Sequence, residues 1–448
     1  MLAIYLARRG YQVDVFEKRK DLRKEADRST DRSIAMSMSH RGWKALDEID
    51  VADAVKQRAI PKYGRVSHLQ DHKYQINKYS KDNQPIYAVN RNDLNNILLT
   101  RAEEYENIRL HFQHQFSGLN EADKEIQFID QHNNITSFIY TRCIGTDGAS
   151  SAVRSWIDDR KKILKKLPVL FGFIETNVPL SKHADQSFQD DYLHFWCSDS
   201  SLIISQSCVD NVFTSTFLNH LEGKDSFDEL DTNDKVSEFF YQNYPSIEEH
   251  LPNLIHDYHN QPVTYIRPIK CQEWNYGDSI LILGDACHAM TPFYGMGMNV
   301  CFEDCLELNK MLDQQNDDWS EVIQKFAATR KVHTDAITDM AHRHRKGIFA
   351  RYNQHFDFKW KLERKINLHY PELLVPEYSL VVFSTMPLAT IQEICLKQLE
   401  LLEKIRVEKG EEILNDDDLF HQNIQQYFSN AECSKMLQEI QPQLEVSQ

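Results

Sequence analysis

The chain has 448 residues, of which 41% are hydrophobic and 26% are charged, and its formal net charge is −16. This length exceeds the size at which one hydrophobic core stops growing, so we expect two or three structural units with little disorder. The acidic balance argues against a nucleic-acid partner, because a phosphate-binding surface needs a concentrated excess of Lys and Arg.

Cysteine usage and hydropathy bear on the compartment. Nine cysteines are scattered from Cys143 to Cys433 without a CxxC pair, which is typical of free thiols in a reducing compartment. The most apolar run, 380–391, is shorter than the about 20 residues that a membrane-spanning helix needs. We therefore expect a cytoplasmic chain without a transmembrane helix or a secretory signal. The sequence predicts no oligomeric state.

The first half of the chain mixes helical and strand spacing. Residues 1–10 predict the end of a helix, and residues 11–17 alternate like a strand that ends in an acid. The polar segment 21–39 is expected to be a loop that crosses a ligand. Helical spacing follows at 39–55 and again at 90–105, where Asn90 is the expected capping residue. Alternating runs at 65–70 and 73–79 predict two strands that form a hairpin, and further runs predict strands at 108–116, 124–130 and 137–145.

In the second half, the predicted secondary structure changes twice along the chain. Short alternating runs between about 165 and 270 predict a mostly antiparallel sheet, whereas a buried strand at 279–283 and a helix at 297–311 return to the first pattern. From about residue 346 the spacing is helical. The sequence thus predicts an α/β fold with a discontinuous Rossmann-like unit (1–60, 88–160 and 271–345), an inserted antiparallel β unit (61–87 and 161–270) and a C-terminal helical region (346–448).

Two turns carry the clearest chemical signal. In CIGTDGASSAVR a strand delivers Gly145, Asp147 and Gly148 into a turn, where the backbone can approach a ligand closely and the carboxylate can contact a sugar or phosphate. In ILILGDACHAMTPFYGMGMNVCFEDC a strand ends near Asp285, and a glycine-rich turn then opens a helix at Gly297. The free N–H groups at the start of that helix, together with its dipole, suit a negatively charged group.

These turns resemble the DG and GD motifs of the flavoprotein aromatic hydroxylases. Within that class, DRSIAMSMSHRGWKAL at 31–46, VNRNDLNNILLTRAEEY at 89–105 and PFYGMGMNVCFEDC at 292–305 resemble the kynurenine 3-monooxygenase family, and similarity covers roughly 1–390. The resemblance implies FAD as cofactor, NADPH and O₂ as co-substrates, and hydroxylation of L-kynurenine to 3-hydroxykynurenine through a flavin C4a-hydroperoxide. That reaction belongs to tryptophan catabolism toward pyridine nucleotides. Because the cofactor performs the chemistry, we nominate no catalytic acid or base.

The resemblance also implies residue roles. Glu17 would bind the adenosine ribose, and Arg32 and Arg91 would lie against the flavin and its phosphates, where the alternative is a solvated surface charge. The cofactor-binding set implied by the motifs is Glu17, Arg32, Arg91, Asp147, Asp285, Gly297, Met298 and Asn299. For the substrate, Arg65, Tyr79 and Tyr378 match the family's grip on a carboxylate by a guanidinium fork and phenolic hydroxyls. The alternatives are an edge-strand charge and core tyrosines.

Other chemistry is not expected. Cys287 and His288 lack an orienting acid, and His342 and His344 lack Cys or carboxylate partners at ligand spacing, so we predict neither a nucleophile nor a metal site.

The sequence departs from the family in three places. Met296 stands where the family has Gln, and Arg343 stands where it has a substrate-binding Asn, so another aromatic carboxylate remains an alternative substrate. The printed chain also begins after the first strand and GxGxxG turn of the βαβ unit, roughly 20 residues. We expect that its coding start was assigned too late and that the chain as printed is unstable. The alternatives are a truncated chain or a flavin-less protein that binds an aromatic amino acid.

Overall fold

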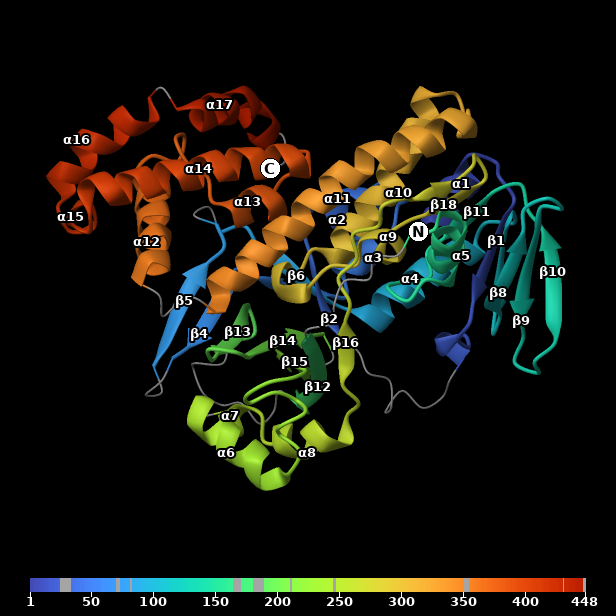
Figure 1. Cartoon of the computed structure of the whole chain (residues 1–448), viewed down its shortest axis with the longest axis horizontal. Coiled ribbons are helices and arrows are strands. Elements are labelled where there is room, and N and C mark those ends of the chain that lie inside the picture. The colour runs from blue at the N-terminus through green and yellow to red at the C-terminus, as the bar shows by residue number, and fades with distance from the viewer. Residues whose placement is uncertain are drawn as a thin grey trace.

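The computed structural model describes residues 1–24, 34–69, 73–80, 83–163, 171–179, 189–209, 212–244, 247–349, 354–429 and 431–445. Figure 1 shows an α/β region around the N-terminus, a sheet with small helices beneath it, and a cluster of C-terminal helices. Among the described residues, no helix combines the length and apolarity that crossing a membrane requires. Arg32 lies outside the described residues.

The α/β region contains two short sheets with parallel pairs. Strand β1 (Val13–Glu17) pairs in parallel with β7 (Ile108–Phe112). Strand β11 (Cys143–Gly145) pairs in parallel with β18 (Ile280–Ile282), which also pairs antiparallel with β17 (Asn275–Tyr276). Among the described strands, β1 pairs only with β7 and β11 only with β18.

Helices surround these sheets. They are α1 (Leu2–Arg8), α2 (His40–Asp47), α3 (Ala52–Lys56), α4 (Arg91–Glu103), α5 (Ala152–Lys161), α9 (Asp285–His288) and α10 (Gly297–Gln314), with a 3₁₀ turn η1 (Leu22–Lys24). The Asn90 side chain accepts hydrogen bonds from the N–H groups of Asn92 (2.8 Å) and Asp93 (3.3 Å), so the predicted start of α4 is confirmed.

The prediction of one strand at 137–145 was wrong. Residues 135–139 form β10, the last strand of a meander made with β8 (Gln115–Asn120) and β9 (Glu125–Ile129), whereas β11 begins at Cys143 in another sheet. The Tyr140 N–H donates to Lys124 O (2.9 Å) and closes the meander, while the Cys143 N–H donates to Ser279 O (2.8 Å) and opens the next sheet. Alternation cannot reveal this change of partner, because both strands share the same spacing.

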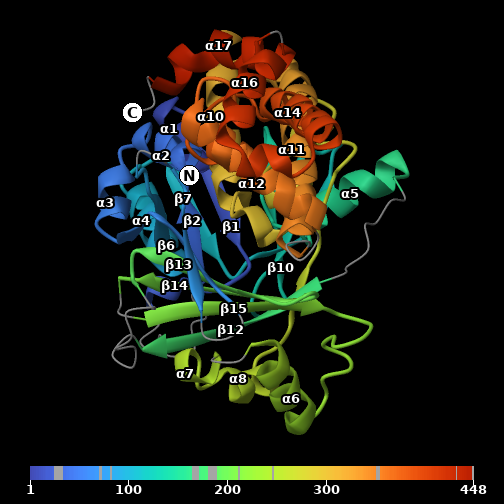
Figure 2. The same ribbon diagram turned by 90° about the vertical axis from the view of Figure 1, so that its left-hand side faces the viewer.

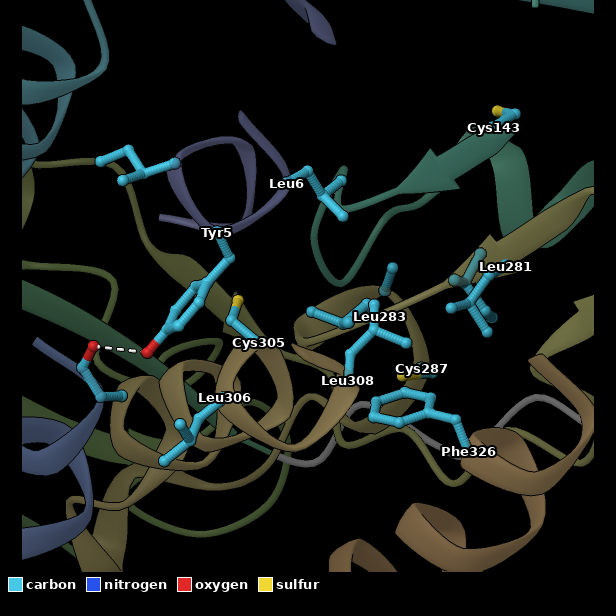
Figure 3. Close-up of a cluster of buried hydrophobic side chains, with 14 of the residues drawn as sticks. Tyr5, Leu6, Cys143, Leu281, Leu283, Cys287, Cys305, Leu306, Leu308 and Phe326 are labelled. Carbon is cyan, nitrogen blue, oxygen red and sulfur yellow. Dashed lines mark hydrogen bonds between the residues drawn. The ribbon is translucent and has the colours of Figure 1, made fainter. Parts of the chain in front are cut away.

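The core of the α/β region forms where α1 and α10 pack against the β11–β18 pair. Figure 3 shows Tyr5 of α1 near Cys305 and Leu306 of α10, and Leu281 of β18 on the other side of the same cluster, beside Leu283. All of these side chains are buried. The Tyr5 hydroxyl donates to Ala45 O (2.8 Å), which joins α1 to α2 without leaving a buried donor unpaired.

The large sheet has seven strands in the order β16-β12-β15-β14-β13-β4-β5. Their bounds are β4 (Gly64–His68), β5 (Tyr74–Lys78), β12 (Phe171–Pro179), β13 (Tyr192–Cys197), β14 (Leu202–Cys208), β15 (Val212–His220) and β16 (Thr264–Ile266). The predicted hairpin of β4 and β5 is confirmed, and all pairs are antiparallel except β13 with β4. A small sheet of β2 (Ala35–Met38), β6 (Ile86–Asn90) and β3 (Ala59–Lys62) adjoins it.

Both faces of the large sheet are covered. Helices α6 (Asn233–Asn243), α7 (Ile247–His250) and α8 (Leu254–Asn260) pack on one face through side chains such as Phe217 and Phe240. The other face, with Phe195 and Leu218, shares a core with Ile337 and Leu380 of the C-terminal helices. Figure 2 shows the sheet between these two layers of helices.

The C-terminal helices form an α-helical layer over the sheet. They are α11 (Trp319–Phe349), α12 (Gln354–His369), α13 (Glu377–Val382), α14 (Leu388–Lys409), α15 (Glu412–Asn415), α16 (Asp417–Phe428) and α17 (Glu432–Glu445). The helical periodicity predicted for α14 is confirmed, with Ile391, Ile394 and Leu402 buried. Helix α11 runs through the predicted boundary at residue 345 without a break, and the division into three units stays a prediction.

Candidate functional site

The two predicted turns lie at one edge of the same sheet. Asp147 follows β11 and Asp285 follows β18, and these neighbouring parallel strands are in register with Gly145 opposite Ile282. Because parallel strands end at the same edge, both turns emerge on the side where α/β folds bind their ligands. The Arg154 guanidinium joins the turns by donating to Ala286 O (2.6 Å).

The two aspartates differ in their own contacts. The Asp147 carboxylate accepts hydrogen bonds from the Ser151 hydroxyl and from the N–H groups of Ala152 (2.7 Å) and Val153 (3.2 Å). It thereby satisfies free N–H groups in the first turn of α5, whose N-cap is Ser151. Asp285 is exposed, and the one contact of its carboxylate among the described residues is the Cys301 thiol at 3.7 Å. Asp285 is therefore the more available of the two for a ligand's hydroxyl groups.

The start of α10 presents unused backbone donors. Gly295 turns the chain with φ +69°, and the first intrahelical bond runs from the Val300 N–H to Met296 O (3.0 Å). The N–H groups of Gly297, Met298 and Asn299 have no acceptor among the described residues. With the helix dipole of this 18-residue helix, they can hold a negatively charged group.

The Asn299 side chain has a separate structural task. Its oxygen accepts from the Ser39 N–H (2.8 Å), and its nitrogen donates to Ser37 O (2.8 Å) and Gly295 O (3.1 Å). The amide thereby fixes the start of α10 against β2, and only the Asn299 backbone is left to face a ligand.

The other predicted cofactor residues lie at ends of elements. Glu17 ends β1, where its carboxylate pairs with the Arg19 guanidinium at 3.0 Å; partial burial opposes ionisation, but Arg19 holds the pKa of Glu17 below its usual range. Arg91 begins α4, its side chain is exposed, and it has no partner among the described residues. Arg91 is thus free to bind an anionic group.

A buried ionic network lies beneath the start of α10. Arg330 of α11 bonds Asp304 (2.8 and 3.0 Å) and Glu303 (3.1 Å), and Glu303 also binds Arg41 of α2. The Nε2 atom of His288 lies 2.6 Å from Asp304. Burial alone would raise the pKa of each carboxyl, but Arg41 and Arg330 lower that of Glu303, and His288 and Arg330 lower that of Asp304.

This network determines what His288 and Cys287 can do. The expectation that His288 lacks an orienting acid was wrong, because its Nε2 atom is bound to Asp304; both His288 and Cys287 are nevertheless buried. Burial raises the pKa of the Cys287 thiol well above its usual value, so it stays protonated and unreactive. Within the described residues, no group of three or more His, Cys, Asp or Glu side chains could hold a metal ion.

A cavity of about 1340 Å³ lies between the sheet and the C-terminal helices. Its walls come from β4, β5, β13, α11, α12, α13 and α14. Tyr294, which lines the cavity, belongs to the 3₁₀ turn η4 (Pro292–Tyr294) and stands three residues before Gly297. The short segment from Tyr294 to Gly297 thus connects the wall of the cavity to the start of α10.

The three predicted substrate residues line this cavity together. The rings of Tyr79 and Tyr378 stack with centroids 5.2 Å apart, and the Arg65 guanidinium lies 5.7 Å from the Phe195 ring centroid. Burial raises the pKa of Tyr378 to about 12 and raises that of Tyr79 well above its usual value, although Arg65 opposes both shifts. Both phenols are therefore protonated donors, and Arg65 has no ion-pair partner among the described residues.

The structure adds Glu377, Glu363 and Arg364 as cavity residues that the sequence did not single out, and it places Arg343 in the same cavity. Arg343 binds Glu377 at 2.9 Å, and the Tyr294 hydroxyl donates to the same carboxylate at 3.3 Å. Glu363 and Arg364 of α12 also line the cavity. Glu377 could have been noticed as an acid beside the predicted ligand Tyr378, but nothing in KWKLERKI distinguishes Glu363 from a solvated helix charge. Met296, which replaces the family's Gln, is buried and is not among the residues that line the cavity.

These observations fit a flavin nucleotide. Unpaired N–H donors at a helix start suit the negative charge of a reduced isoalloxazine, exposed Asp285 suits sugar hydroxyls, and free Arg91 suits phosphates or the ring. Gly284, with φ +67° and ψ −143°, brings the backbone close to this edge in a conformation that side chains disfavour.

Comparison with known proteins agrees with this geometry. The family described as FAD binding domain matches residues 1–341. Kynurenine 3-monooxygenase of Legionella pneumophila (strain Corby) is 34% identical over 408 residues, covering 90% of each chain. The enzyme of the same name from Flavobacterium johnsoniae is 31% identical over 423 residues, covering 94% of each chain.

Solved structures show the same fold at low identity. The chain matches p-nitrophenol 4-monooxygenase PnpA of Pseudomonas putida with a TM-score of 0.62, 16% identity and coverage of 83% of this chain and 94% of that one. It matches Pseudomonas aeruginosa PqsL in complex with 2-aminobenzoylacetate with a TM-score of 0.61, 16% identity and coverage of 78% and 94%.

Proposed function

The chain belongs to the kynurenine 3-monooxygenase family, and from this membership we propose that it is an FAD-dependent monooxygenase that hydroxylates L-kynurenine to 3-hydroxykynurenine. The observation that carries the substrate assignment is the unpaired Arg65 guanidinium beside two protonated phenols in a cavity that adjoins the α10 turn. That arrangement suits the carboxylate of an amino acid whose ring points toward the flavin.

Each residue has a positioning task in this proposal. Arg65 binds the substrate carboxylate as a fork, and Tyr79 and Tyr378 donate hydrogen bonds to it. FAD, when bound, supplies the oxygen chemistry, so the chain needs no acid or base of its own. The free N–H groups of Met298 and Asn299 stabilise negative charge on the ring of the cofactor, and the aromatic walls exclude water from it.

The remaining cofactor assignments rest on the motifs and on the contacts described above. Glu17 binds the adenosine ribose, Asp285 the ribityl or ribose hydroxyls, and Arg91 and Arg32 the phosphates or ring. Asp147 contributes by holding the turn after β11 through its hydrogen bonds to the first turn of α5. We also propose NADPH as the reductant, O₂ as the co-substrate, and a cytoplasmic role in tryptophan catabolism toward pyridine nucleotides.

Substrate-stimulated NADPH oxidation tests the proposal. The purified protein is supplied with FAD, NADPH and O₂, and oxidation is recorded with L-kynurenine or with a phenolic acid. We expect a marked stimulation by L-kynurenine and none by the phenolic acid. If only the phenolic acid stimulates oxidation, L-kynurenine is the wrong substrate. If the protein binds no flavin, the assignment as a flavin-dependent enzyme is wrong.

A further inference from the structure

We propose that the cavity has a second, acidic pole, at which the Glu363 carboxylate binds the α-ammonium group of the substrate. The site would then select zwitterionic α-amino acids over simple aromatic carboxylates. This inference rests on the proposed function and names the substrate class of the same site.

The first argument is that Glu363 has no partner of its own. It is half-buried, it lines the cavity, and it makes no hydrogen bond or ion pair with any described residue. Its neighbour Arg364 is directed elsewhere: the guanidinium donates to Asn77 Oδ1 (2.7 Å) and lies 4.7 Å from the Trp360 ring centroid. A carboxylate in this position can form an ion pair with a cationic group of a ligand.

The second argument is that the neighbouring carboxylate is already satisfied. Glu377 receives hydrogen bonds from Arg343 (2.9 Å) and from the Tyr294 hydroxyl (3.3 Å). Burial raises the pKa of Glu363 to about 7, the negative charge of Glu377 adds to the shift, and Arg364 opposes it. An ammonium group bound between them would offset the cost of keeping Glu363 ionised in this environment.

The third argument is the complementarity of the two poles. Arg65 is a cation without an ion-pair partner among the described residues, Glu363 is a carboxyl group without one, and both line the same cavity. A zwitterion satisfies both charges, whereas an aromatic monoanion satisfies Arg65 and leaves Glu363 unpaired. Rejection by an unpaired buried group is how such sites discriminate between ligands that differ by one polar group.

The test compares two ligands on the FAD-loaded protein by calorimetric titration. The ligands are L-kynurenine and its α-desamino analogue, which keeps the ring, the ketone and the carboxylate. The variants are Glu363→Gln and, as a matched loss of charge, Glu372→Gln at the exposed border of the cavity. We expect wild type and Glu372→Gln to prefer L-kynurenine. Glu363→Gln should weaken L-kynurenine binding roughly 10- to 100-fold and leave the analogue unchanged or tighter.

The pH dependence gives a second readout. The groups that face Glu363 are Glu377, Arg364 and the Cys395 thiol, with Arg343 behind Glu377. Burial holds the pKa of Cys395 well above its usual value, so that thiol stays neutral. As the pH falls below about 7, a proton on Glu363 should compete with the ammonium group and reduce the wild-type preference for L-kynurenine. The preference of Glu363→Gln should not change over that range.

The outcomes separate this inference from the function on which it rests. If wild type binds L-kynurenine and Glu363→Gln binds it equally well, or weakens both ligands to the same extent, the acidic pole is wrong and the proposed function stands. If wild type binds neither ligand, both fail. Loss of the preference in Glu372→Gln as well as in Glu363→Gln would also overturn the specific role of Glu363.

Discussion

At the scale of single residues, the cavity depends on charges that the protein itself leaves unpaired. Arg65 is placed by β4, opposite Asn77 of β5, with its guanidinium over Phe195. A guanidinium kept without a counter-ion in a partly enclosed site gains its full interaction only when an anion binds.

Replacing Arg65 tests the carboxylate pole. In Arg65→Met the guanidinium is lost while much of the apolar stem is kept, so we expect KM for L-kynurenine to rise roughly 10- to 100-fold, as the loss of a charge-assisted hydrogen bond predicts. The measurement is NADPH oxidation against substrate concentration. Arg109→Met, on the exposed side of β7, is the control and should leave KM unchanged. An unchanged KM in Arg65→Met would contradict the assigned carboxylate site.

Sequence reasoning reached the basic pole of the cavity but not the acidic one. Arg65, Tyr79 and Tyr378 match the residues with which the family binds a carboxylate, so their convergence could be expected although they are far apart in the chain. Glu363 lies in a helix where charged residues are frequent, and only the position of α12 over the cavity distinguishes it. The roles of Arg41 and Arg330 in the buried ionic network were missed for the same reason, because the sequence does not show whether an arginine is buried or exposed.

At the scale of elements, the ionic network holds four segments around the start of α10. Arg330 extends from α11 to Glu303 and Asp304, and His288 extends from α9 to Asp304. Arg41 joins α2 to α13 through Val381 O (3.1 Å). The apolar helix faces set which helices pack, while these bonds set how α10 is oriented toward the cofactor site.

Breaking the network should destabilise the whole molecule. Arg330→Met leaves two buried carboxylates short of a partner, so we expect a loss of about 3–5 kcal/mol in the free energy of unfolding. Lys331→Met, which removes an i,i+4 surface pair with Asp335, should change it by less than about 1 kcal/mol. Chemical denaturation measures both, and equal stabilities for the two variants would refute the structural role of Arg330.

The same network predicts how the stability difference between wild type and Arg330→Met depends on pH. The folded-state pKa values of Glu303 and Asp304 are lowered, so their contribution is complete above the unfolded pKa values of about 4 and is lost as the pH falls through the folded values. The gap in Tm between wild type and Arg330→Met should therefore be widest near neutral pH and shrink in acid. A gap that stays constant across the titration would show that packing, not charge, is responsible.

Gly284 tests the turn after β18. With φ +67° and ψ −143°, it occupies a conformation that is almost restricted to glycine, and an added Cβ would meet the Cys301 Sγ at 3.2 Å. We expect Gly284→Ala to cost about 1–3 kcal/mol of stability and to weaken FAD binding. Gly118→Ala, where the nearest atom is 3.9 Å away, is the matched control. Fluorescence of released flavin follows the second effect, and normal retention in Gly284→Ala would count against the turn as part of the cofactor site.

At the scale of the whole molecule, the α/β region, the sheet and the C-terminal helices meet around one cavity. The sequence predicted the antiparallel sheet, the β4–β5 hairpin and the helical C-terminal region from local spacing. It did not predict that β4 pairs in parallel with β13, more than a hundred residues later, because pairing between distant strands is decided by shared burial and leaves no local signal. The sequence did not predict that α12 and α14 form walls of the cavity, because contacts between distant segments leave no local signal either.

The central claim is that this arrangement brings one flavin and one molecule of L-kynurenine together for oxygen transfer. Mass spectrometry of the product formed from isotope-labelled O₂, with FAD, NADPH and L-kynurenine present, addresses it directly. The account predicts 3-hydroxykynurenine that carries one labelled oxygen atom on the ring. NADPH consumption that yields only hydrogen peroxide would contradict it. So would a hydroxylated product without the label, because its oxygen would then come from water and not from O₂.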